Sequence, residues 1–415
     1  MEKNRLKIFI SAYACEPGLG SEIGVGWHWV LEMSKYFELW VLTRKSNQHT
    51  IEPWVKEHPE YSGIHFLYYD WPKWARFWKK GLRGVRTYYN LWQMCADRIV
   101  ERTMKANGIK IFHHLTYGNV LWKVSSYGQK QFFIWGPVGG LETIPAEYSH
   151  HYDRRSKIVE MVRRAVVKFL PINFGFKNRC RMADLILCKT DVTRQAIPEK
   201  YRNKAVLFTD VAVETAKNKS ATTKHASNVV NFLSVGRLDA WRGFDLAIEA
   251  MAIAVKSNPN IKLTIVGKGM DTARLKGLIE KHQLQQHVEM TGALSMAEYK
   301  ERLTETDCVV NTALKEAAVT VSFDCLAYGK PLICIDTTGY TRYFSNEYAV
   351  VISQGERQST IECISSAMLR LTQSDERSKL SNAAKDAASR FTWEHRGEEI
   401  RDIILKTYAD KHSIG

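Results

Sequence analysis

The chain has 415 residues, of which 45% are hydrophobic and 25% charged, so it is long enough for two globular domains of roughly 200 residues each. No apolar run approaches the ~20 residues that span a bilayer, and the eight cysteines form no C-x-x-C pair, which excludes the usual zinc and disulfide frameworks. The formal net charge of +15 favours an anionic partner, namely nucleic acid, a phosphorylated ligand or a membrane surface.

The first predicted strand, "KIFISAY" (7–13), leads into a glycine-rich turn, "PGLGSEIGVGW" (17–27), and then into a helix-like stretch. A strand, such a turn and a helix in this order commonly form a phosphate-binding loop. A dehydrogenase-type dinucleotide site would need an acid at the end of the second strand, which instead ends "TRK" (43–45). The N-terminal apolar run is too short for a signal peptide, so we expect a cytoplasmic protein.

Two stretches, 71–90 and 154–181, combine Lys and Arg with large aromatic or aliphatic residues. Such a composition, on helices too short to span a bilayer, suits peripheral contact with an anionic membrane on its inner, cytoplasmic face. An ordinary solvated basic surface with the aromatic side chains in the core is the competing interpretation. We expect no nucleic-acid partner, because no helix-turn-helix, zinc finger or RNA-stacking motif accompanies the charge.

Short β-like runs alternate with helical stretches along both halves of the chain, without a solenoid repeat. The polar, lysine-rich segment 214–228 between the halves is typical of a linker. We therefore predict an α/β fold of two doubly wound, Rossmann-like domains, 1–213 and 229–390, with a C-terminal helix in 391–415. Ligands of such sheets bind at the carboxyl ends of the strands, here in the cleft between the domains.

In the second half, "LSVGRLDAWRGFDLAIEAM" (233–251) predicts a strand, a turn and a helix. Arg237 and Arg242 bracket the turn, and the fork of donors on a guanidinium matches the oxygens of a diphosphate. Gly267 and Gly292 follow two further predicted strands in the same position. The pattern indicates a phosphate site at these strand ends.

The stretch "NTALKEAAVTVSFDCLAYGKPLICIDTTG" (311–339) places Glu316 before a loop and Asp324 eight residues later, in a predicted helix. A helix N-terminus directs free N–H groups and a positive dipole at whatever lies before it. These N–H groups and the two arginines can neutralise a diphosphate without a metal, and no Asp-x-Asp motif offers metal ligands. We therefore expect no metal and no other cofactor.

The order G-R-L…R-G, V-G-K-G, T-G and E-x7-D…A-x-G-K-P-L-I resembles the retaining GT-B glycosyltransferases of family four. "GLGSEIGVGW", "FHHLTYG" and "WGPVGG" resemble bacterial members that act in cell-surface polysaccharide assembly. The resemblance covers nearly the whole chain, including the closing "FTWEHR" helix, which in this fold crosses back to the first domain. It implies retaining transfer from a nucleotide-diphosphate sugar to a hydroxyl of a glycan or lipid-linked glycan acceptor.

The resemblance also implies roles for single residues. Arg237 and Arg242, the second usually a lysine, would hold the diphosphate, and Glu316 would contact the donor sugar. Asp324 would hold the ribose hydroxyls, although Asp in place of Glu shortens the reach by one methylene. The remaining donor-side residues that it implies are Gly20, Ser21, Gly236, Gly267, Gly292, Val319 and Thr320.

On the acceptor side the resemblance implies His113, His114, Trp135 and Glu142. The two histidines end a predicted strand, where adjacent side chains point to opposite faces, so one of them can reach the acceptor cleft while the other packs. For either histidine alone, a hydrogen-bonded structural role is the favoured interpretation. Two alternatives remain open: a GT-B sugar-nucleotide epimerase or phosphorylase, and a non-catalytic basic membrane-binding protein.

Overall fold

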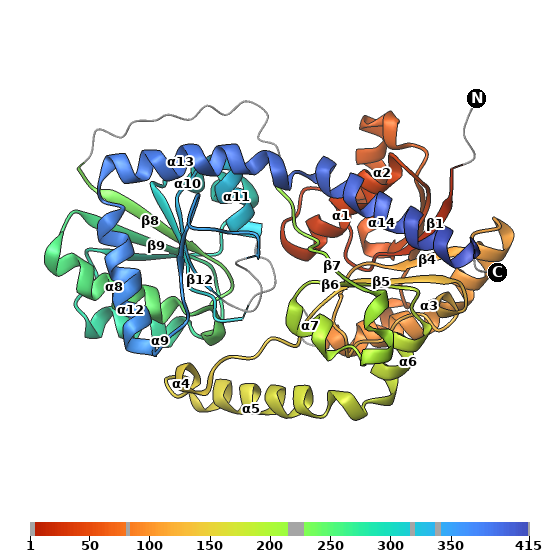
Figure 1. Ribbon diagram of the computed structural model, residues 1–415, viewed down its shortest axis with the longest axis horizontal. Helices are drawn as coiled ribbons and strands as arrows, with labels where there is room; N and C mark the ends of the chain where they lie inside the picture. The colour runs from red at the N-terminus through yellow and green to blue at the C-terminus, as the bar shows by residue number, and fades with distance from the viewer. Residues whose placement is uncertain (1–4, 80–83, 215–227, 316–319, 337–341, 414–415) are drawn as a thin grey trace. The chain divides into compact units, whose positions relative to one another are not determined.

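A computed structural model describes residues 5–79, 84–214, 228–315, 320–336 and 342–413 of the chain. The chain forms two compact α/β units (Figure 1). The first unit consists of Met1–Leu141, Lys168–Asp210 and Trp393–Gly415, and the second of Glu142–Val167 and Val211–Thr392.

The first unit contains a parallel sheet of seven strands in the order β3-β2-β1-β4-β5-β6-β7. Its central strands are buried along their whole length, as in the run FFIWGPV of β5, because helices cover both faces of a parallel sheet. The strands are β1 (Lys7–Ser11), β2 (Glu38–Arg44), β3 (His65–Tyr69), β4 (Ile111–His114), β5 (Phe132–Val138), β6 (Leu185–Cys188) and β7 (Ala205–Leu207).

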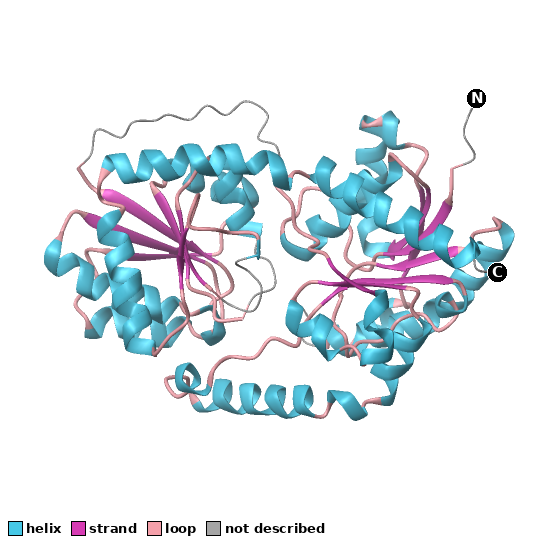
Figure 2. Cartoon of the chain, in the orientation of Figure 1, coloured by secondary structure: helices cyan, strands magenta, loops and turns pink. Residues whose placement is uncertain are grey.

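Helices flank the strands of the first unit (Figure 2). They are α1 (Ser21–Ser34), α2 (Gln48–Glu57), α3 (Val85–Ala106), α6 (Phe174–Met182), α7 (Asp191–Ala196) and the C-terminal α14 (Trp393–Ser413). The C-terminal helix packs on α1, where the Trp393 ring stacks on His28 with centroids 5.3 Å apart. Gly397 permits this close approach, because a Cβ there would lie 3.0 Å from the carboxylate of Glu32.

The second unit contains a parallel sheet of six strands in the order β10-β9-β8-β11-β12-β13. The strands are β8 (Val230–Val235), β9 (Ile261–Val266), β10 (Val288–Gly292), β11 (Cys308–Asn311), β12 (Leu332–Ile335) and β13 (Val350–Ile352). The helices are α4 (Ala146–Ser149), α5 (Arg154–Lys168), α8 (Phe244–Ser257), α9 (Thr272–Lys281), α10 (Met296–Glu305), α11 (Thr320–Tyr328), α12 (Arg357–Arg370) and α13 (Ser374–Ala388).

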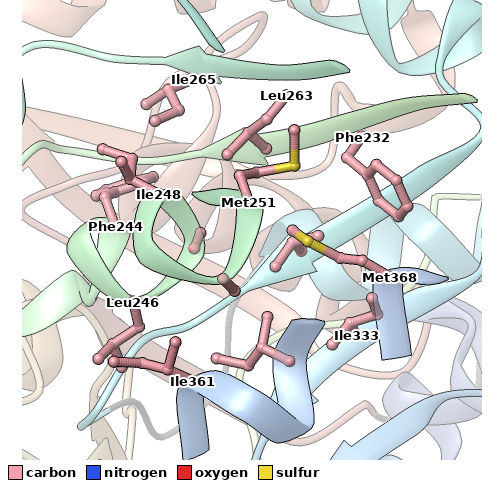
Figure 3. Packing of buried hydrophobic residues seen from close by; sticks show 14 of the residues in the cluster. Phe232, Phe244, Leu246, Ile248, Met251, Leu263, Ile265, Ile333, Ile361 and Met368 are labelled. Carbon is pink, nitrogen blue, oxygen red and sulfur yellow. The ribbon is translucent and has the colours of Figure 1, made fainter. Parts of the chain in front are cut away.

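The core of the second unit lies between its sheet and the pair α8 and α12 (Figure 3). Met251 of α8 and Met368 of α12 are both fully buried in the cluster that contains Leu263 of β9 and Ile333 of β12. Burying side chains of this size contributes about 1.5–3 kcal/mol each, so this cluster holds the helices against the strands.

The segment 142–167 belongs to the second unit, whereas the sequence analysis placed it in the first domain. Tyr148 and Tyr152 are part of the hydrophobic core of the second unit. The Tyr148 hydroxyl donates a hydrogen bond to the Gly355 carbonyl at 2.7 Å and contacts Thr360 Oγ1 at the same distance. Residues 215–227, the greater part of the expected linker, lie outside the described residues.

Candidate functional site

Three glycine turns meet at the carboxyl edge of the second sheet, where β8, β9 and β10 end. The Gly236 amide donates to the Val266 carbonyl at 3.0 Å, and the Gly267 amide donates to the Gly292 carbonyl at 2.8 Å. A Cβ at position 267 would lie 1.8 Å from the Gly236 oxygen, so only glycine fits there. The three turns that the sequence predicted therefore form one continuous backbone surface.

The turn after β8 is fastened to the loop after β11. Gly243 has φ +66°, and a Cβ there would lie 2.2 Å from the Thr312 carbonyl oxygen. The Thr312 hydroxyl donates to the Arg242 carbonyl at 3.3 Å, and the Leu314 amide donates to the Trp241 carbonyl at 3.0 Å. The arginine-bearing turn and the segment that leads to α11 thus hold each other in place.

Both predicted diphosphate ligands lie on this turn. The Arg237 side chain is 58% exposed, and its Nε donates to Asp239 Oδ2 at 2.5 Å. The guanidinium carries four further N–H donors, which can receive an anion. The Arg242 guanidinium lies 4.5 Å from the centroid of the Trp241 ring, which restricts its position beside Gly236.

Asp324 lies on α11, where its carboxylate accepts a hydrogen bond from the Tyr299 hydroxyl at 2.7 Å. Burial raises the pKa of Asp324 to about 6, although the hydrogen bond from Tyr299 acts in the opposite direction. The sequence analysis did not identify Tyr299 as a partner of Asp324. Tyr299 follows Glu298, which forms the capping box of α10 together with Ser295, each side chain bonding to the backbone of the other residue. Thr320 begins α11, and the predicted residues Glu316 and Val319 lie outside the described residues.

A buried ion pair joins Lys315, the residue before Glu316 in the sequence, to Glu160 of α5. The exposed fractions of the two side chains are 7% and 4%. Glu160 also accepts a hydrogen bond from the Ile144 amide at 3.1 Å, and burial lowers the pKa of Lys315. The two residues are 155 positions apart in the sequence. The only signal for the pair in the sequence is Glu160 itself, a single acid within the basic stretch of α5.

In the first unit, the predicted residues Gly20 and Ser21 form the start of α1. Gly20 is the N-cap, and Ser21 has φ +57°, an uncommon conformation for a residue with a side chain. The next residue, Glu22, accepts a hydrogen bond from the Tyr117 amide at 2.6 Å, and burial raises its pKa. The glycine turn is thereby tied to the segment after β4.

The residues expected on the acceptor side are largely internal. His113, His114 and Trp135 are each at most 1% exposed, and this burial is compatible with the structural role favoured for the histidines. Nε2 of His113 lies 2.8 Å from the Gly136 carbonyl oxygen, and desolvation lowers the pKa of the two histidines to about 4 and about 3 respectively. Glu142 belongs to the second unit and is also buried, with its carbonyl accepting from Arg163 Nε at 2.9 Å.

The cysteines and the other side chains that can bind metals are dispersed through the described residues. All eight cysteines are free thiols, and six of them are buried. Within the part of the chain that the structure describes, no three His, Cys, Asp or Glu side chains come together as metal ligands. Among the described residues, no helix is both long and apolar enough to cross a bilayer.

The part of the chain that carries these turns is similar to known proteins. Residues 216–387 match the family described as Glycosyl transferases group 1, a range that includes both arginines and the glycine turns. The chain is 25% identical over 157 residues to one of the subunits of phosphatidylinositol N-acetylglucosaminyltransferase from Arabidopsis thaliana. That match covers 38% of this chain and 35% of the relative, so the chain spans about a third of the length of this curated relative.

Solved structures show the fold over almost the whole chain. WaaG, a glycosyltransferase involved in lipopolysaccharide biosynthesis, superposes with a TM-score of 0.61 at 16% identity, covering 96% of this chain and 99% of WaaG. HepE of Anabaena, in complex with UDP-glucose, superposes with a TM-score of 0.59 at 13% identity. The superposition covers 97% of this chain and 100% of HepE. The fold is that of the GT-B enzymes. Within this fold, residues 216–387 are similar to the glycosyl transferases group 1 family.

Proposed function

We propose that the protein is a retaining glycosyltransferase that moves a sugar from a nucleotide-diphosphate sugar to a hydroxyl of a glycan or lipid-linked glycan. The observation that carries the proposal is the turn after β8, where Arg237 and Arg242 stand beside glycines packed too closely for any side chain. This turn lies at the carboxyl edge of a parallel sheet and inside the region that matches the glycosyltransferase family.

The chemistry that this arrangement supports is departure of a nucleoside diphosphate. As the bond between the sugar carbon and the phosphate oxygen breaks, negative charge grows on the diphosphate. The guanidinium groups and the N-terminus of α11 stabilise that charge, and they need no metal to do so. The acceptor oxygen then bonds to the sugar carbon on the face that the diphosphate leaves, and the hydroxyl proton passes to a phosphate oxygen.

The acceptor class is supported by the names of similar proteins. WaaG takes part in lipopolysaccharide biosynthesis, and the name of the Arabidopsis relative contains the lipid phosphatidylinositol. We infer a role in cell-surface polysaccharide biosynthesis, on the cytoplasmic side of a membrane. The donor is inferred from HepE, which was solved with UDP-glucose, and UDP-sugars are therefore the first donors to test.

The test is a thermal-shift series with UDP-, GDP- and ADP-glucose. A donor at 100 times its dissociation constant stabilises the protein by about 2.7 kcal/mol, which corresponds to a rise of about 5–11 °C in Tm for a unit of this size. Arg237→Ala should remove the rise, whereas Arg370→Ala, which changes an exposed arginine paired with Glu376, should keep it.

Turnover of radiolabelled donor completes the test. We expect Arg237→Ala to lower transfer by about 10²–10³-fold with the protein still folded. Wild-type turnover in Arg237→Ala would remove the assignment of this turn. A sugar epimer formed without any acceptor would show an epimerase instead.

A further inference from the structure

Helix α5 presents its apolar residues to solvent instead of to the protein. Over fifteen residues, RRSKIVEMVRRAVVK, it contains a single acid. Five apolar side chains on it are large and exposed. They lie close together on one helix, whereas exposed apolar residues are ordinarily scattered singly over a protein surface. They are Ile158 (56%), Val159 (56%), Met161 (63%), Val162 (52%) and Val166 (39%), and we call them the α5 apolar face.

The α5 apolar face occupies one side of the helix. At 100° per residue, these five positions fall within an arc of about 160°, which is a contiguous stripe and not a random scatter. A stripe of this width on a helix of a globular protein normally faces the core.

The opposite side of α5, which faces the second unit, is charged. Glu160 makes the buried ion pair with Lys315 and accepts from the Ile144 amide. Arg163 donates to the Glu142 carbonyl at 2.9 Å, and Arg164 donates to the Ile144 carbonyl at 2.7 Å. These polar contacts fix which side of the helix points inward, so the exposure of the apolar face is built into the structure.

Basic side chains lie along one edge of the α5 apolar face, at Lys157 and Lys168, and continue it at its N-terminal end, at Arg154 and Arg155. The exposed ones on the helix are Arg154, Arg155, Lys157 and Lys168, and no acid on α5 offsets them, because Glu160 is buried. Directly after the helix, three residues of the first unit are also large, apolar and exposed. They are Phe169 (59% exposed), Ile172 (73%) and Phe174 (82%).

We propose that α5 docks on an anionic lipid surface, with its apolar face inserted at the boundary between headgroups and acyl chains. Fifteen residues make a rod of about 22 Å, too short to span a bilayer and suited to lying along it. The apolar side chains leave water, and the basic side chains remain at the level of the phosphates. A second copy of the chain is a poorer occupant, because a symmetric pairing would set the two basic borders against each other.

The test is flotation of the full-length protein with vesicles of phosphatidylcholine alone and of phosphatidylcholine with 30% phosphatidylglycerol. We expect binding to the anionic vesicles that weakens as salt is added. Arg155→Gln with Lys157→Gln should lower the partition coefficient by about 25-fold, since each basic side chain near the surface is worth about fivefold. Val159→Ser with Val162→Ser should lower the partition coefficient in both low and high salt, because salt does not screen the burial of apolar side chains.

Matched controls change the same residue types elsewhere. Lys276→Gln with Lys281→Gln removes two exposed charges from α9, and Met94→Ser with Leu405→Ser removes two exposed apolar side chains. Neither pair should alter flotation. The donor-induced thermal shift should persist in all four double variants, which separates lipid docking from donor binding.

Three outcomes would overturn the proposal. One is equal flotation of wild type and both α5 variants. Another is equal binding to vesicles with and without phosphatidylglycerol. The third is a wild-type dimer, seen by light scattering, that the α5 variants dissociate, because the face would then belong to a second copy of the chain.

Discussion

Replacing Glu160 by Gln tests how segment 142–167 is held to the second unit. The substitution keeps the shape of the side chain but leaves the Lys315 ammonium buried without its carboxylate. Breaking a buried pair from one side costs about 3–5 kcal/mol, because the remaining charge is not solvated. For a unit of about 200 residues, this corresponds to a fall in Tm of about 6–20 °C.

The pH dependence of this loss identifies its cause. Burial already lowers the pKa of Lys315 in the wild type, and removing Glu160 removes a group that raises it. A lysine whose folded pKa lies below its unfolded value binds fewer protons when folded, so the free energy of unfolding rises with pH up to the unfolded pKa. The deficit of Glu160→Gln should therefore shrink between pH 7 and pH 9, by at most about 1.4 kcal/mol per pH unit.

Urea unfolding at pH 7, 8 and 9 measures both effects. Glu160→Leu combined with Lys315→Met is the control, because replacing both charges by apolar groups of similar size is often close to neutral. This account of the pair would be refuted if Glu160→Gln lowered the free energy of unfolding by less than about 1 kcal/mol, or if that loss did not change with pH.

Three other predictions concern buried groups and close packing. His113 and His114 are held neutral by burial, so each should lower the free energy of unfolding by about 2 kcal/mol between pH 7 and pH 5, and His113→Asn should reduce that slope in denaturant titrations. Gly267→Ala should abolish the donor-induced thermal shift by forcing β8 and β9 apart, whereas Gly277→Ala, on α9 with nothing within 4 Å, should stabilise the protein by about 0.5–1 kcal/mol. If the ionised Asp324 binds the ribose, the donor dissociation constant should rise about tenfold from pH 7 to pH 5, and calorimetry on Asp324→Asn should show no such change.

The sequence predicted what depends on local pattern. Alternating strand and helix signals predicted two doubly wound units, and the glycines after three strands correctly marked the carboxyl edge of the second sheet. Arg237 and Arg242 were placed on one turn because both lie within a few residues of the same strand. These features follow from spacing along the chain.

Long-range packing was not predictable in the same way. The partnership of Lys315 with Glu160 joins residues far apart in the sequence, and the hydrogen bond from Tyr299 to Asp324 joins two helices that a strand separates. The two histidines end a strand, a position from which the sequence could not decide between an acceptor contact and a structural role, and both side chains are enclosed. Composition marked 154–181 as a stretch rich in basic and apolar residues, without showing which side of α5 faces inward, since that depends on which carbonyls its arginines reach.

The path of the chain between the units has a consequence for dissecting the protein. The chain passes from one unit to the other after residues 141, 167, 210 and 392. Severing the backbone between 214 and 228 would therefore not yield two independent halves. The N-terminal piece would still supply α4 and α5 to the second unit, and the C-terminal piece would still supply α14 to the first. The two fragments are interlaced, so they should remain associated after cleavage and should be made together to fold.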